Sequence, residues 1–103
     1  MVRERVIQTI RYGYFREARD GLEELARLCG EKGLRVFTCW APVAGVSNEM
    51  IIETEYESLE EFEREQVAFY SDADIMKRWR DVAQYVIEGS GRSELLESAP
   101  ALA

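Results

Sequence analysis

Two glutamates in one predicted strand are the first side chains that could do acid–base chemistry. Glu53 and Glu55 share one face of that strand, and the rise of an extended chain puts them about 7 Å apart. Two carboxylates at this distance could raise each other's pKa and act as acid and base. The alternative is a solvated or salt-bridged face. A slip of one residue would instead turn Thr54 and Tyr56 inward.

The phenols are a second source of protons. A tyrosine buried among apolar side chains can donate a hydrogen bond to a developing oxyanion. Their residue type alone does not single one out. The five are Tyr12, Tyr14, Tyr56, Tyr70 and Tyr85.

Four further side chains could line a binding pocket. Trp40 and Trp79 are either stacking walls for an aromatic or polyketide-like ligand or ordinary core residues. Gln66 and Phe69 lie on the apolar stripe of a predicted helix. An amide on such a stripe is either a hydrogen-bonding group of a pocket or a satisfied core amide. We treat all four as candidate substrate-binding residues.

The composition excludes several familiar chemistries. The chain of 103 residues has no histidine, which removes the commonest metal ligand, the commonest general base, and every Ser-His or Cys-His nucleophile. Cys29 and Cys39 lie in apolar patterns that predict buried thiols. Phosphate loops, dinucleotide fingerprints and metal-ligand spacings do not occur, so we expect neither a cofactor nor a metal.

Charge and the N-terminus bear on partners and location. A formal net charge of -7 disfavours nucleic acid and anionic membranes as partners. Residues 1–5 carry charges where a signal peptide needs apolar residues, and no apolar run approaches the length of a membrane helix. We therefore expect a cytoplasmic protein.

Hydrophobic periodicity predicts the elements that must position these side chains. Strands are expected over 5–12, 34–41, 50–56 and 89–96, and helices over 15–29 and 59–86. Gly30 and Gly33 mark the end of the first helix, Ser58 and Glu61 form a capping box for the second, and Ser71 marks a break. The β-α-β-β-α-β order predicts a ferredoxin-like α+β fold, in which two helices cover one face of a four-stranded antiparallel sheet.

The domain is expected to cover residues 1–97, and residues 98–103 are expected to form a frayed tail. Apolar residues occur at both parities of the predicted strands, although two helices can cover one face only. One set is Ile7, Phe37, Cys39 and Ile51, and the other is Val6, Trp40 and Ile52. A second copy of the chain, packed sheet to sheet, would cover the open face, so we predict a homodimer.

Several short motifs resemble those of NIPSNAP proteins, which belong to the dimeric α/β-barrel superfamily. The central ones are Trp40, Asn48 and Tyr56-Glu57-Ser58-Leu59; the outer ones are Ile10-Arg11, Phe15-Arg16, Arg19 and Arg92 to Leu96. Glu17-Ala18 stands where that family usually has Pro-Gly, and Gly13 stands where a tyrosine is usual. The superfamily includes cofactor-free monooxygenases, polyketide cyclases, isomerases and ligand-binding regulators, many of them in secondary metabolism.

The resemblance implies a pocket between the sheet and the second helix, with Arg11 and Tyr56 as catalytic residues. Arg11 would bind a carboxylate or enolate, unless it pairs with Glu53 or Glu55. Haem bound through a histidine of the second helix is excluded, because the region around Trp79 has none. The leading hypothesis is a cofactor-independent enzyme acting on a small hydrophobic molecule. The alternative is a non-catalytic binding or scaffolding module with a filled interior.

Overall fold

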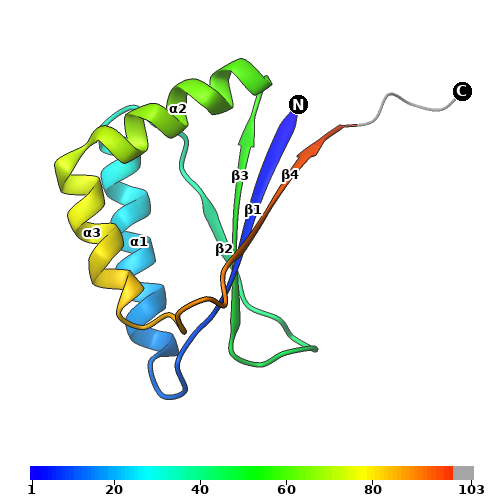
Figure 1. Ribbon diagram of the computed structural model, residues 1–103, viewed down its shortest axis with the longest axis vertical. Helices are drawn as coiled ribbons and strands as arrows, with labels where there is room; N and C mark the ends of the chain where they lie inside the picture. The colour runs from blue at the N-terminus through cyan, green and yellow to red at the C-terminus, as the bar shows by residue number, and fades with distance from the viewer. Residues whose placement is uncertain (99–103) are drawn as a thin grey trace, which may run out of the picture.

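A four-stranded antiparallel sheet of order β2-β3-β1-β4 carries three helices on one face in the computed structural model (Figure 1). The structure describes residues 1–98. The elements are β1 (Val2–Thr9), α1 (Phe15–Glu31), β2 (Thr38–Trp40), β3 (Glu49–Tyr56), α2 (Leu59–Ser71), α3 (Ala73–Ala83) and β4 (Arg92–Glu97). The predicted ferredoxin-like class is confirmed. The predicted tail lies, apart from Ser98, outside the described residues, and the Ser98 N–H donates to the Met1 carbonyl at 2.9 Å.

β1 is the central strand, and its alternation sorts the two faces of the sheet. Val6 pairs with Ile52 of β3 and Ser93 of β4, and these three side chains face the helices. Ile7 and Ile51 pair on the opposite, open face. β1 begins three residues earlier than periodicity predicted. The charged residues at its start belong to the strand, because they form ion pairs with residues of neighbouring strands.

β2 is shorter than predicted, and its parity is reversed. Cys39 pairs with Ile52 on the helix face, whereas Trp40 pairs with Ile51 on the open face. Phe37 packs with Cys39 against the core. The prediction that placed Phe37 and Cys39 opposite Val6 and Ile52 is therefore wrong. Both parities of this segment are apolar, so the pattern alone could not orient it.

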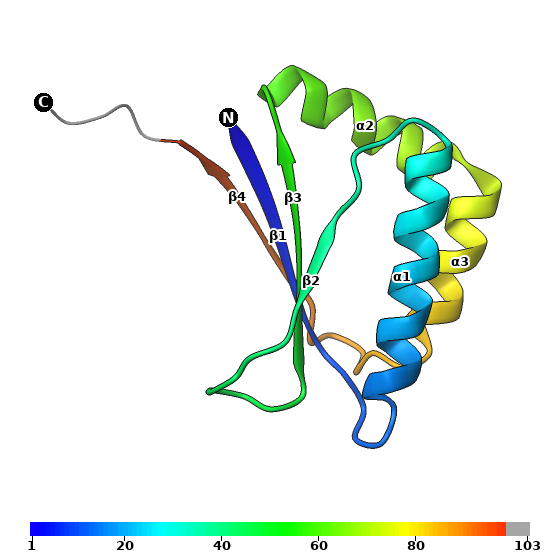
Figure 2. The same ribbon diagram turned by 180° about the vertical axis from the view of Figure 1, so that it is seen from behind.

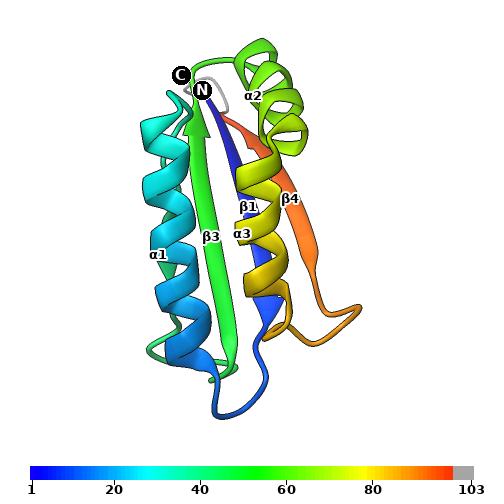
Figure 3. The ribbon, with the colours of Figure 1, turned by 90° about the vertical axis from the view of Figure 1, so that its left-hand side faces the viewer.

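The core lies between the sheet and the helix pair α1 and α3, which run side by side (Figure 3). Gly21 of α1 allows their close approach, because a Cβ there would lie 2.9 Å from Val82 Cγ2 of α3. Gly30 lies inside α1, and the turn that follows uses Gly33 at a φ of 80°. The fully buried members of the core include Ile10, Leu22, Leu25, Met50, Ile75 and Val82.

The predicted break in the second helix is present, but Asp72 rather than Ser71 caps the helix after it. The Asp72 carboxylate accepts hydrogen bonds from the backbone N–H groups of Asp74 and Ile75 at 2.9 and 3.0 Å. It also pairs with Lys32 Nζ at 2.7 Å. The cap predicted for α2 is confirmed, since the Glu61 N–H donates to Ser58 Oγ at 3.1 Å.

Removing the α3 cap should destabilise the fold at neutral pH. The hydrogen bond from Lys32 and the N–H of Ile75 hold the Asp72 pKa below its ordinary value. This stabilisation is present above the unfolded-state pKa and is lost as the pH falls through the lower folded-state pKa. Asp72→Ala should lower the melting temperature by roughly 5 °C at pH 7, and by much less near pH 3. Ser71→Ala is the control, and an equal loss in both variants would contradict the assignment of the cap.

Among residues 1–98, no helix is both long and apolar enough to cross a membrane. The cytoplasmic location stays a prediction.

Candidate functional site

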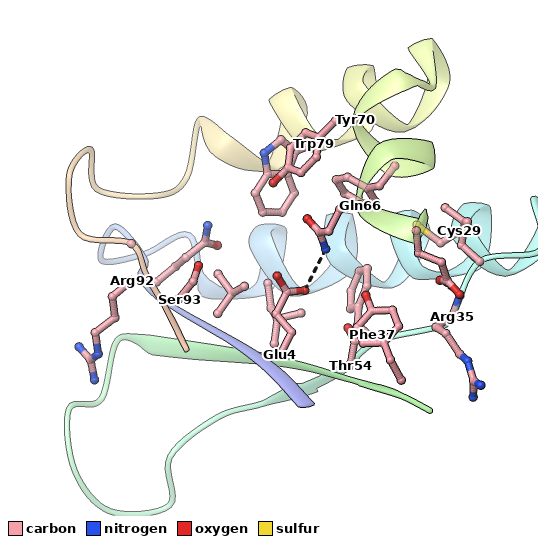
Figure 4. A pocket seen from close by; sticks show the side chains of 18 residues that line it. Glu4, Cys29, Arg35, Phe37, Thr54, Gln66, Tyr70, Trp79, Arg92 and Ser93 are labelled. Carbon is pink, nitrogen blue, oxygen red and sulfur yellow. Dashed lines mark hydrogen bonds between the residues drawn. The ribbon is translucent and has the colours of Figure 1, made fainter. Parts of the chain in front are cut away.

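A cavity of about 240 Å³ lies between the helix-facing side of the sheet and the helices (Figure 4). Its floor comes from β1 and β3, and its opposite wall comes from α2 and α3. The polar or ionisable side chains that line it include Glu4, Gln8, Thr54, Tyr56, Glu65, Gln66 and Ser93. The aromatic ones are Phe37, Tyr56, Phe69, Tyr70 and Trp79.

Strand alternation brings polar groups to an otherwise apolar floor. Glu4 pairs with Thr54 across β1 and β3, two positions along the register from the Val6–Ile52 pair. Because alternate residues face the same side, Glu4 points with Val6 into the cavity. Tyr56 closes the end of the same row on β3, where it is 6% exposed.

Glu4 is a partly buried carboxyl group of the cavity lining, with a side-chain hydrogen bond to Gln66. Gln66 Nε2 of α2 lies 3.5 Å from Glu4 Oε1 and donates to it (Figure 4). Burial raises the Glu4 pKa above its ordinary value, and the bond from Gln66 lowers it by less. No arginine or lysine contributes to this shift. The carboxyl group is therefore a candidate acid or base.

Tyr56 remains a proton donor at neutral pH. Burial raises its pKa to about 12, and the nearby carboxylates of Glu4 and Glu65 add to the effect. Its ring packs edge-to-face on Phe62 with centroids 5.3 Å apart, which fixes its orientation. The phenol and the Glu4 carboxyl thus form a donor and a proton acceptor in one cavity.

The far wall is aromatic. Phe69 of α2 packs edge-to-face against Trp79 of α3 with centroids 6.1 Å apart, and against Tyr70 at 5.2 Å. The α2–α3 break at Asp72 sets the angle that brings these rings together. Such a wall suits a planar apolar ligand.

The two arginines at the rim are already paired. Arg35 donates from its backbone N–H to Glu65 Oε1 at 2.7 Å and from Nε to Glu61 Oε1 at 2.6 Å. Arg92 Nη2 lies 3.8 Å from Glu49 Oε2. The segment between α1 and β2 is thereby tied to α2 at the edge of the cavity.

The predicted site residues separate into two groups. Tyr56, Gln66, Phe69 and Trp79 line the cavity together. Trp40 does not, because the reversed parity of β2 leaves it 55% exposed on the open face.

Arg11 is the other predicted residue outside the main cavity. It follows β1, its N–H donates to the Tyr85 carbonyl at 2.8 Å, and it lines a second cavity of about 400 Å³. A strand over 5–12 would have carried Arg11 along the sheet, but β1 ends at Thr9. The predicted end of the first strand was therefore wrong, and this is why Arg11 does not lie in the main cavity as predicted.

The glutamate pair of β3 is part of a salt-bridged face, as the alternative interpretation held. Glu53 lies 3.6 Å from both Arg3 Nε and Arg5 Nε, and Glu55 pairs with Arg3. Thr54 and Tyr56 occupy the cavity side instead.

The thiols are poor candidates for chemistry. Burial raises the pKa of Cys29 and of Cys39 to about 11, so both stay protonated near neutral pH. Cys29 is buried as predicted, whereas Cys39 is only partly buried. In the described part of the chain, no three carboxylate or thiol groups cluster as metal ligands would.

Sequence reasoning missed Glu4 and Gln8. The signal was present, because both share the parity of Val2, Val6 and Ile10 in a strand that could be extended toward the N-terminus. A polar residue at such a position either has a partner across the sheet or faces a cavity.

The sheet order, the helix layer and the cavity define a small α+β domain of ferredoxin-like topology with room for a ligand. No protein-family model and no curated protein matches the sequence. Solved structures do match. A NIPSNAP domain protein from Burkholderia xenovorans has a TM-score of 0.79 at 14% identity, covering 100% of this chain and 99% of that one.

Two further structures have the same architecture. A NIPSNAP family protein from Agrobacterium tumefaciens has a TM-score of 0.77 at 17% identity, covering 95% of this chain and 92% of that one. An antibiotic biosynthesis monooxygenase has a TM-score of 0.74 at 9% identity, covering 97% of this chain and 100% of that one. The resemblance to NIPSNAP proteins is confirmed at the level of the fold.

Proposed function

We propose that this chain is a homodimeric enzyme that acts on a hydrophobic, aromatic or polyketide-like small molecule without a metal or nucleotide cofactor. The observation that carries the proposal is Glu4, a carboxyl group in an aromatic-walled cavity that accepts a side-chain hydrogen bond from the amide of Gln66. Its raised pKa makes it a stronger base than a solvated glutamate. The reaction would be of the cyclase, isomerase or cofactor-free monooxygenase type.

The chemistry would begin with the removal of a proton from a carbon next to a ligand carbonyl. The Glu4 carboxylate takes the proton, and the electron pair moves to the carbonyl oxygen to form an enolate. The Tyr56 O–H, which stays protonated because its pKa is about 12, donates to that oxygen. Gln66 holds Glu4 in place, and the rings of Phe69 and Trp79 exclude water from the reacting atoms.

Hydrogen–deuterium exchange at carbon tests this proposal. 2-Tetralone is a bicyclic ketone with acidic C–H groups beside its carbonyl, and NMR in D₂O follows their exchange directly. We expect the full chain to accelerate the exchange above the rate in buffer. If 2-tetralone binds in an NMR titration but exchanges only at the buffer rate, the proposed catalysis is overturned. The non-catalytic binding module then becomes the better description.

The open face of the sheet supports the homodimer part of the proposal. Trp40, Ile51 and Ile7 form an apolar row across β2, β3 and β1 at one end of this face. Arg3, Arg5 and their glutamate partners occupy the other end. None of the helices in residues 1–98 covers this side (Figure 2). A second copy could bury the apolar row and pair its charged end with complementary charges.

A charge at the β2 end of the apolar row should therefore prevent association. Trp40→Glu is expected to convert a dimer into a monomer of 11.9 kDa, because an unpaired carboxylate in an apolar interface is costly. Val67→Glu is the control, since Val67 lies on α2 and is 68% exposed. Light scattering measures both masses. A monomeric wild-type chain would rule out the homodimer.

A further inference from the structure

Gln8 is a polar side chain of the cavity that the proposed reaction does not use. It lies on the helix-facing side of β1, two residues after Val6, and is 9% exposed. Its Oε1 is buried, and no hydrogen-bond donor contacts it within residues 1–98. Buried acceptors are normally paired, and an unpaired one destabilises the folded chain. The missing donor is therefore a feature that needs an explanation.

The position of Gln8 indicates where such a donor would come from. Gln8, Trp79 and Gly91 line both the main cavity and the second cavity, so the amide stands at the boundary between the two spaces. The last bond of a glutamine side chain rotates over a broad range. Oε1, which is covered in the ligand-free chain, can thus turn toward a molecule in the cavity.

The charges around the cavity favour a donor over an anion. Glu4 and Glu65 are carboxyl groups in its lining, and Gln8 adds an unpaired acceptor. The two arginines of the rim already pair with carboxylates, Arg35 with Glu61 and Arg92 with Glu49. A carboxylate ligand would meet these acceptors without an unpaired cation in the lining. A hydroxyl or N–H group of a ligand could instead donate a hydrogen bond to the unpaired acceptor of Gln8.

We propose that Gln8 selects the ligand of the main cavity by accepting a hydrogen bond from it, so that the site takes a neutral aromatic molecule bearing a hydroxyl or N–H group. This inference rests on the proposed function, because it names the ligand chemistry of the same cavity. Gln8 contributes specificity, whereas Glu4 and Tyr56 carry the reaction.

Three naphthalene probes separate the body of the ligand from its polar group. 2-Naphthol has a donor, 2-methoxynaphthalene has the same rings without one, and 2-naphthoate carries a negative charge. NMR titration of the full chain gives the dissociation constants. We expect 2-naphthol to bind at least tenfold more tightly than either of the others, since one hydrogen bond to a buried acceptor is worth about that factor.

Gln8→Met keeps the length of the side chain and removes its polar atoms. In this variant 2-naphthol should lose about tenfold in affinity, whereas 2-methoxynaphthalene should not, so that their ratio approaches one. The ligand-free variant should melt at the same temperature as the wild-type protein or higher, because it no longer buries an unpaired acceptor. The melting measurement also shows that the variant folds.

The outcomes distinguish the two proposals. Equal binding of 2-naphthol and 2-methoxynaphthalene by the wild-type protein would overturn the role of Gln8 and leave the cavity as a ligand site. A preference for 2-naphthol that persists in Gln8→Met would also overturn the role of Gln8 and leave the cavity as a ligand site. If none of the three probes binds, the proposed function fails, and the inference about Gln8 fails with it.

Discussion

Glu4→Gln should slow the exchange of 2-tetralone protons by at least about a hundredfold, because a positioned general base contributes roughly 10²–10⁴ to such a step. The amide has nearly the shape of the carboxyl group but cannot take a proton from carbon. The cavity and its aromatic wall should remain, so affinity for the probe should change little. NMR in D₂O measures both the exchange rate and the binding.

The pH dependence adds a second readout. Since burial raises the Glu4 pKa, wild-type exchange should increase with pH through a midpoint above the ordinary glutamate value, and the variant should lack this increase. The raised pKa also means that ionised Glu4 opposes folding above the unfolded-state pKa. Glu4→Gln should therefore be at least as stable as the wild-type protein at pH 7, so unfolding would not explain a lost rate.

Glu63→Gln provides the matched control for this experiment. Glu63 lies on the exposed side of α2, outside the cavity lining. The Glu63→Gln substitution removes the same charge by the same chemical change, and we expect it to exchange 2-tetralone protons at the wild-type rate. An equal loss in both variants would point to net charge rather than to a base at Glu4. Full activity in Glu4→Gln would remove Glu4 from the mechanism.

Leu22→Ala should lower the free energy of unfolding by about 3 kcal/mol, within the usual range for a large-to-small change in a core. Leu22 of α1 is 0% exposed and belongs to the cluster that joins α1, α3 and the sheet. Gly21 beside it already places the two helices in close contact, so the backbone has little room to close over the void. In a domain of this size, the melting temperature should fall by more than about 10 °C.

Leu59→Ala is the comparison that isolates burial. Leu59 is also a helical leucine, but it is 49% exposed at the start of α2. We expect its unfolding free energy to change by less than about 0.5 kcal/mol. Urea unfolding of both variants measures the difference. A similar small loss for Leu22→Ala would mean that the α1–α3 contact adapts more freely than its close packing indicates.

Periodicity predicted the helices and the order of the strands along the chain, because each strong pattern was compatible with only one type of element. In α1, Leu22, Leu25 and Cys29 recur at helical spacing, and polar residues fill the other side. β2 had no such contrast, since Phe37, Cys39 and Trp40 are all apolar. Its orientation depends on the register with β3, a tertiary feature that a single strand does not encode.

The site was harder to predict, because its residues come from separate elements. Tyr56 and Trp79 were found through motif and residue type, and they do face one cavity. Glu4 was missed because the charged residues beside it hid the strand pattern at the start of β1. Those charged neighbours in fact form ion pairs on the open face of the sheet. The cavity also depends on the helix break at Asp72. Hydrophobic periodicity does not predict the volume that remains between packed elements.

The placement of the two tryptophans has a practical consequence. The chain has two tryptophans, and the structure puts Trp40 on the open face of the sheet and Trp79 in the wall of the cavity. Trp40→Phe would leave a single tryptophan beside the ligand site, and Trp79→Phe would leave one on the proposed contact between copies. Emission spectra of these two variants would thus report ligand occupancy and self-association separately, without an added label.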